Sequence, residues 1–130
     1  MLDTTFIASN DTFDIIYFAN KYNISDDEYW IKGTKDRFGR ENKDTGFKLF
    51  ITENENVVQH FDDLKYFLKK CKELLFELRE NNINMYFDIG MTIETSKYMA
   101  RYFRLDNDIL TEITNAGLGI EMSTYIASEE

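Results

Sequence analysis

Proline is absent from this 130-residue sequence, and cysteine, histidine and tryptophan each occur once. A single cysteine excludes an intramolecular disulfide framework and fits a reducing compartment. Histidine and cysteine carry much of the acid–base and nucleophilic chemistry that proteins perform near neutral pH, so their scarcity disfavours an enzyme. No run of residues is apolar for long enough to cross a membrane, and the N-terminal residues lack the pattern of a signal peptide. We therefore expect a cytoplasmic protein with no membrane partner.

Acidic residues outnumber basic residues in the sequence. It contains twenty-four Asp and Glu and fifteen Lys and Arg, which gives a net charge of −9. Such a field attracts basic surfaces and repels phosphate backbones. Apolar residues make up 43% of the chain and aromatic residues 15%, enough for a sizeable core in one globular domain over residues 1–130. We expect a protein that binds a basic protein partner and makes no direct contact with nucleic acid.

Hydrophobic periodicity predicts an α+β domain in the order βαββαββαβ, with an antiparallel or mixed sheet of about six strands. The strongest signal is one long helix over residues 57–81. Its apolar residues recur at i, i+3 and i+4 in a single stripe: Phe61, Leu64, Leu68, Cys71, Leu75 and Leu78. Two shorter helices are expected, one over residues 11–22 with Phe13, Ile16, Ala19 and Tyr22 on one face, and one that begins at Asp106 and ends at Gly117.

The strands are expected over residues 5–8, 29–32, 47–52, 83–95, 98–105 and 118–125. Residues 98–105 are predicted to form an antiparallel hairpin with residues 83–95, joined by a turn at 95–97. Strict alternation in the 83–95 strand places one set of side chains on its polar side: Tyr86, Asp88, Gly90, Thr92 and Glu94. Residues 35–46 form the clearest loop, and Glu53 to Asn56 is polar and turn-like.

No side chain stands out as catalytic. Cys71 lies in the apolar stripe, where we expect a packing role. His60 lies in the first turn of the long helix, where we expect it to cap the helix at the surface or to contact a partner. One His and one inward-facing Cys give no zinc-binding spacing, and phosphate-binding and hydrolase motifs are absent. The paired acids Asp26/Asp27, Asp62/Asp63 and Asp106/Asp108 are explained as turn and cap residues, so we expect no enzyme, no metal and no cofactor.

Two kinds of segment are candidates for contact with a partner. The first is a set of acidic turns and a helix start: Asp26, Asp27, Glu28, Glu53, Glu55, Asp62 and Asp63. The second is the loop tip with Arg37, Phe38 and Arg40, in a stretch from Lys32 to Asp44 that carries +2 and leaves −11 for the rest. An exposed Phe between two Arg is typical of an interface. The alternative for this loop is a solvated connection whose Phe folds back on the core. Tyr29 and Trp30 lie near the acidic segments, and for Trp30 we expect a core role.

Several segments together resemble a known family. Trp30-Ile31-Lys32-Gly33, the stretch from Leu105 to Leu110 and the stretch from Gly117 to Met122 carry the resemblance, with the long helix between them. They are similar to a family of small uncharacterised bacterial α+β domains with a Trp-x-x-Gly strand, a long helix, a β-hairpin, a short helix and a closing strand that ends near a Tyr, here Tyr125. Some members are candidate immunity proteins of bacterial toxin systems. The resemblance implies a binding role and supplies no catalytic residues.

The leading hypothesis is an immunity or inhibitor protein that neutralises a toxin, expected to be a basic nuclease-type domain, by tight binding through acidic surface. The second is an acidic DNA mimic or anti-defence protein that blocks a nucleic-acid-binding enzyme, which requires two rows of carboxylates at phosphate-like spacing. The third is a small hydrolase or ligand-binding domain that uses the concave side of the sheet.

The purified protein should not bind duplex DNA or RNA at physiological salt, because its net negative charge repels phosphate. Electrophoretic mobility shift and fluorescence anisotropy measure this. A micromolar affinity that weakens with salt would contradict it.

Overall fold

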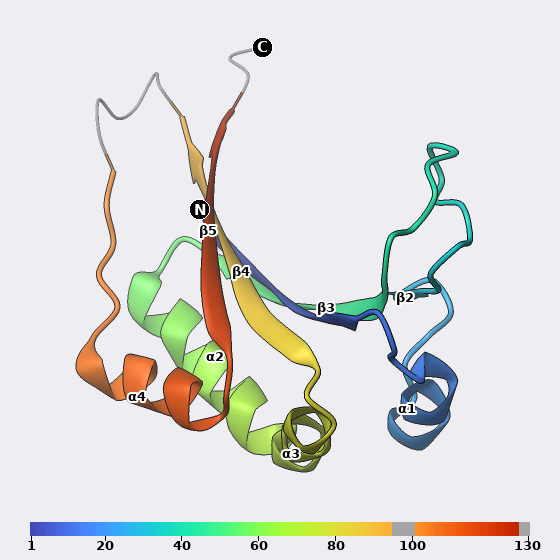
Figure 1. Cartoon of the computed structure of the whole chain (residues 1–130). Helices are drawn as coiled ribbons and strands as arrows, with labels where there is room; N and C mark the ends of the chain where they lie inside the picture. The colour runs from blue at the N-terminus through green and yellow to red at the C-terminus, as the bar shows by residue number, and fades with distance from the viewer. Residues whose placement is uncertain (95–100, 128–130) are drawn as a thin grey trace.

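The computed structural model describes residues 1–94 and 101–127 and has a layer of helices on one side of a twisted sheet (Figure 1). The strands are β1 (Leu2–Asn10), β2 (Tyr29–Trp30), β3 (Thr45–Asn54), β4 (Asn84–Ile93) and β5 (Gly119–Ile126). The helices are α1 (Ile15–Tyr22), α2 (Val57–Lys70), α3 (Lys72–Glu80) and α4 (Asn107–Asn115). The predicted α+β class is confirmed.

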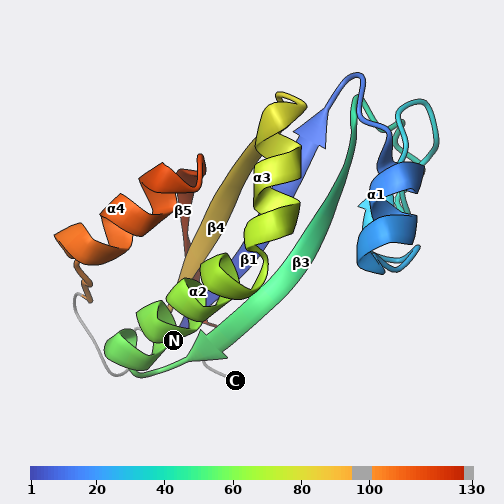
Figure 2. The same cartoon turned by 90° about the horizontal axis from the view of Figure 1, so that it is seen from below.

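The sheet is mixed, in the order β2-β3-β1-β4-β5. β1 pairs antiparallel with both β3 and β4, β2 pairs antiparallel with β3, and β5 pairs parallel with β4. Seen from below, all four helices lie in front of the strands (Figure 2). The segment between β2 and β3 rises on the other side (Figure 1). One face of the sheet is therefore covered and the other is open.

The covered face forms the core. Along β1, Leu2, Thr4, Phe6 and Ala8 are buried, and the residues between them are half-buried on the open face. Phe6 lies at the centre, with ring centroids 5.8 Å from Phe47, 5.4 Å from Phe67 and 6.3 Å from Phe87. These rings come from β3, α2 and β4, so one aromatic cluster joins three strands to the helix layer.

A buried polar network joins the same elements near the start of α2. His60 is fully buried, with its Nε2 2.6 Å from Thr4 Oγ1 and its Nδ1 2.8 Å from Asn54 Oδ1. Asn54 donates its amide to Asp63, a carboxylate that only accepts, and this fixes the orientation of the Asn54 amide. His60 Nδ1–H therefore donates to Asn54, and Thr4 donates to the neutral Nε2. The predicted surface position of His60 is wrong, since the side chain is buried. Asn56 caps α2 instead, by accepting from Gln59 N–H.

The predicted long helix is two helices, because it breaks at Cys71. α2 packs on β3 and β1, whereas α3 packs on β4. These strands diverge with the sheet twist, and the break lets each helix follow its own strands. Cys71 is half-buried against the core, and burial raises the pKa of its thiol. A packing role agrees with this environment.

The described residues form five strands and not the predicted six. Of the segment predicted as a hairpin partner for β4, residues 98–100 lie outside the described residues and residues 101–105 form no strand. The alternating side chains of residues 101–105 make contacts other than strand pairing. Phe103 packs against Phe61 of α2, and Arg101 forms an ion pair with Glu55. The edge of β4 is taken by β5, which runs parallel to it.

The two shorter helices confirm the prediction in outline. The first begins at Ile15, after Asp14, whose side chain accepts from Tyr17 N–H. Its buried face is Ile15, Phe18 and Ala19. Ile16 is 47% exposed and lies on the solvent side, so its predicted place on one face with Ala19 is wrong. Gly117 ends α4 with φ +86° as predicted, and Leu118 N–H reaches back to Ile113 O.

The buried network predicts a pH-dependent stability. Burial lowers the pKa of His60 below its ordinary value. Below about pH 6.5, His60 becomes protonated in the unfolded chain while it stays neutral in the folded protein. The free energy of unfolding should therefore be independent of pH above this value and fall below it. Urea unfolding of the wild type should show lower stability at about pH 5.5 than at about pH 7.5.

His60→Gln is the matched variant, since the chain then contains no His. It should lose roughly 1–3 kcal/mol through disturbed buried hydrogen bonds, and the slope between these two pH values should disappear. An unchanged slope in the variant would contradict the assignment.

Candidate binding surfaces

The open face of the sheet gathers acidic and aromatic side chains from all five strands. Residues paired directly across neighbouring strands share a face. The register therefore places Asp3 beside Glu53, and Asp88 beside Glu121, on the face opposite the core. Lys48 is the only Lys or Arg that the strands place on this face. We define the acidic–aromatic face by these residues: Asp3, Glu53, Asp88 and Glu121, with Trp30, Phe50, Tyr86 and Tyr125.

Tyr86 lies on this face near the start of β4, opposite Ile7 of β1 and Gly119 of β5. Burial raises the pKa of its phenol, and the carboxylates of Glu121, Asp88 and Asp44 raise it further. These three acids come from β5, β4 and the segment before β3. The phenol therefore stands near carboxylates from three segments of the chain.

Two glycines make room for aromatic rings on the acidic–aromatic face. A Cβ at Gly90 would come within 2.7 Å of Asp3 Oδ1 and 3.0 Å of the Tyr125 ring. A Cβ at Gly46 would meet the Trp30 ring at 2.8 Å. Both rings therefore approach the backbone at strand glycines, where a side chain would collide with them. Trp30 also donates from Nε1 to Asp44 at 2.8 Å. It is half-buried and lies outside the core, so the predicted core role for Trp30 is wrong. Tyr29 packs against the core instead.

The predicted acidic contacts are not brought together. Asp26 and Asp27 are exposed in the turn before β2, and Glu28 accepts from Ser25 N–H within that turn. Glu53 lies on the acidic–aromatic face, within β3 and not in a turn as predicted, since the strand continues to Asn54.

Glu55 follows β3 and is paired with Arg101 and with the N-terminal amino group, and the hydrogen bond from Arg101 lowers the pKa of the Glu55 carboxyl. Asp62 is exposed on α2, on the helix side. Asp63 accepts from Thr52, Asn54 and Gln59, and these hydrogen bonds lower the pKa of its carboxyl. Asp63 is thus engaged in supporting the His60 network.

The loop tip is an ordered hairpin. Asp36 accepts hydrogen bonds from the N–H groups of Phe38 and Arg40, and the bond from Arg40 lowers the pKa of its carboxyl. Phe38 is 66% exposed, with the Arg37 guanidinium 4.7 Å and the Arg40 guanidinium 5.2 Å from its ring centroid. Phe38 does not fold back on the core. Gly39, with φ +79°, completes the turn. This preorganised tip is a second candidate contact.

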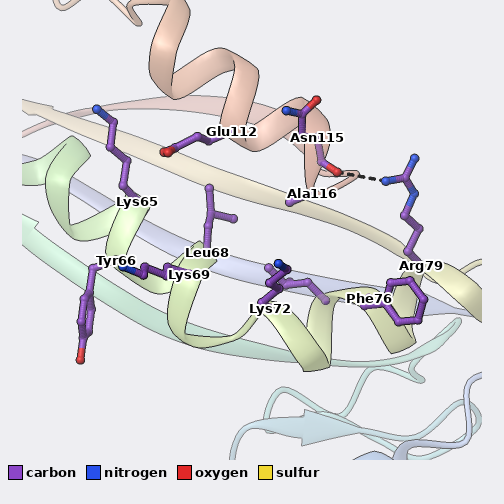
Figure 3. Close-up of a pocket in the computed structure, with 11 residues that line it drawn as sticks. Lys65, Tyr66, Leu68, Lys69, Lys72, Phe76, Arg79, Glu112, Asn115 and Ala116 are labelled. Carbon is purple, nitrogen blue, oxygen red and sulfur yellow. Dashed lines mark hydrogen bonds between the residues drawn. The ribbon is translucent and has the colours of Figure 1, made fainter.

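The helix side carries a groove that the sequence patterns did not reveal. It lies between α2–α3 and α4 and has a volume of about 570 Å³ (Figure 3). Its lining is mainly basic and apolar, in contrast to the acidic–aromatic face. The signal in the sequence was the row of Lys on the outer side of the long predicted helix, which a solvated helix face also explains.

The described residues offer no constellation for metal chemistry, since residues 1–94 and 101–127 contain no group of three or more His, Cys, Asp and Glu arranged around a common point. Among the described helices, none has the length and apolar composition needed to cross a membrane. The three surfaces present carboxylates, aromatic rings, and ammonium and guanidinium groups.

The fold is that of a small α+β domain, with a five-stranded mixed sheet, helices on one side and an open polar face on the other. The chain matches the domain of unknown function DUF4279 over residues 2–127 and belongs to that family. No curated protein and no solved structure matches the chain.

The hairpin makes its own prediction. Asp36→Ala removes the acceptor for two backbone N–H groups, so residues 37–40 should become mobile on the nanosecond timescale. Heteronuclear NOE values for these residues should fall in the variant and stay unchanged in Asp26→Ala, a control in another exposed turn. Unchanged values in Asp36→Ala would show that the hairpin does not depend on this carboxylate.

Proposed function

We propose that this protein is a cytoplasmic inhibitor of the immunity type, which neutralises a basic toxin domain by binding it on the acidic–aromatic face. The observation that carries the proposal is the register of the sheet, which collects Asp3, Glu53, Asp88 and Glu121 beside exposed aromatic rings. Carboxylates recognise Lys and Arg, and aromatic rings add cation–π contacts and buried area.

The mixture of side chains favours a protein partner over DNA mimicry. A mimic requires rows of carboxylates in place of phosphates, whereas here the acids alternate with Phe50, Tyr86 and Tyr125. Phe50 is 63% exposed and Tyr125 is 51% exposed. Exposed aromatic residues are enriched at protein interfaces and supply most of the binding energy there.

The hairpin tip extends the same proposal. It rises on the open side of the sheet (Figure 1), so a partner seated on the acidic–aromatic face meets Phe38 at the rim. The guanidinium groups of Arg37 and Arg40 would then contact acidic residues of the partner and set its orientation.

The test uses the protein encoded by the adjacent gene, purified as a complex with this chain. Glu53→Lys/Glu121→Lys should slow association on the order of tenfold and flatten its salt dependence, since surface charges act mainly on encounter. Asp26→Lys/Asp27→Lys is the matched control, with the same charge change at exposed acids off the acidic–aromatic face. Stopped-flow fluorescence of Trp30, the single Trp, reports the association rate.

Phe50→Ala should speed dissociation, while Phe76→Ala, which removes a ring of similar exposure (64%) on the helix side, should leave it unchanged. If the Asp26/Asp27 pair alone slows association, the turn before β2 is the site. If only Arg37→Ala and Arg40→Ala abolish binding, the hairpin is the site. Absence of any complex with the adjacent gene product would contradict the inhibitor proposal itself.

A further inference from the structure

The groove on the helix side is electrostatically opposite to the chain as a whole. Its lining includes four basic side chains and one acid, net +3, in a protein of net charge −9: Lys65, Lys69, Lys72, Arg79 and Glu112. The floor is apolar, because it is formed by Leu68 and Leu75, which are 8% and 2% exposed. Basic side chains gathered in one groove create a local positive potential, which attracts an anionic ligand.

The two ends of the groove are fixed by contacts between the helices. Lys65 on α2 bonds to Asp108 on α4, and Arg79 on α3 donates to the Asn115 carbonyl oxygen at 3.0 Å (Figure 3). Between these ends, Lys69 and Lys72 are exposed. Neither has an ion pair with a carboxylate in residues 1–94 and 101–127. Two ammonium groups over an apolar floor are thus available to a ligand.

We infer that this groove binds an acidic peptide segment that places an apolar side chain on Leu68 and Leu75 and carboxylates on Lys69 and Lys72. The lining from Lys65 to Arg79 extends about 20 Å along two helices, the length of about six extended residues. Tyr66 and Phe76 are 66% and 64% exposed at the rim, as is typical of surfaces that contact proteins. The groove lies on the side of the sheet opposite the acidic–aromatic face, so this site does not rest on the proposed function.

Charge complementarity selects this occupant. A nucleic acid of comparable length is repelled by the net charge of −9. The Arg79 guanidinium also already donates to the Asn115 carbonyl oxygen. A peptide supplies two or three negative charges next to an apolar anchor, which matches the basic and apolar lining. The acidic peptide also approaches a groove whose lining carries net +3.

The probe is a displayed library of random peptides, selected on the wild-type protein and then measured individually by fluorescence anisotropy. Selected peptides should carry Asp or Glu flanking an aliphatic or aromatic residue. Lys69→Glu/Lys72→Glu should weaken their binding by at least about tenfold. Lys32→Glu/Lys43→Glu, the same charge change in the hairpin segment, should leave binding unchanged, as should Glu53→Lys/Glu121→Lys on the acidic–aromatic face.

Ala116→Phe provides a second variant, since it fills the groove without altering charge and should also weaken binding. Circular dichroism verifies that each variant is folded. The proposal is overturned if selection enriches no sequence, or enriches neutral or basic ones, or if peptides bind Lys69→Glu/Lys72→Glu as tightly as the wild type. Preferential binding to phosphatidylglycerol vesicles would indicate a lipid surface instead. Self-association that Lys69→Glu/Lys72→Glu abolishes would indicate a second copy of the chain.

Discussion

The packing of Phe6 against rings from β3, β4 and α2 is the interaction on which the arrangement depends. It fixes which face of β1 is covered, because alternate residues along a strand point to opposite faces. Once Phe6 is inside, Thr4 meets His60, and Asp3 and Thr5 must face outward. A shift of β1 by one residue would expose Phe6 and bury Asp3, so aromatic packing and carboxylate placement are set together.

The consequence is a domain with two chemically different sides. Carboxylates and exposed rings gather on the open face of the sheet, while Lys side chains line a groove among the helices. Both surfaces rest on regular secondary structure, which holds side chains more rigidly than loops do. Gly46 and Gly90 leave room for Trp30 and Tyr125 close to the backbone. Under the two proposals, a basic partner and an acidic peptide would bind on opposite sides of the sheet.

Much of the fold follows from local patterns, and the departures have physical causes. The 83–95 strand, the helix before Gly117 and the closing strand were predictable because their periodicity and stop signals are local. The break at Cys71 was not, because it reflects the twist of strands distant in the sequence. Residues 101–105 alternate like a strand, yet the alternation is used by Phe103 packing on Phe61.

The binding surfaces were partly visible in the sequence. Asp88 and Tyr86 were placed on one polar side of their strand, but only the parallel pairing of β5 puts Glu121 beside Asp88. His60 looked like a surface residue because its neighbours are acidic, and its burial arises from Thr4, which is 56 residues away. Acidic residues that are near in sequence, such as Asp62 and Asp63, took separate roles.

The central claim is that the open face of the sheet, and not a helix or a turn, receives the basic partner. Side-chain NMR of the labelled protein during titration with that partner tests it most directly, because rings on both sides of the sheet report separately. The account predicts that the resonances of Phe50, Tyr86 and Tyr125 shift together and saturate at one stoichiometry, while those of Tyr66 and Phe76 stay in place. Shifts confined to Tyr66 and Phe76, or to the Asp26–Glu28 turn, would contradict it.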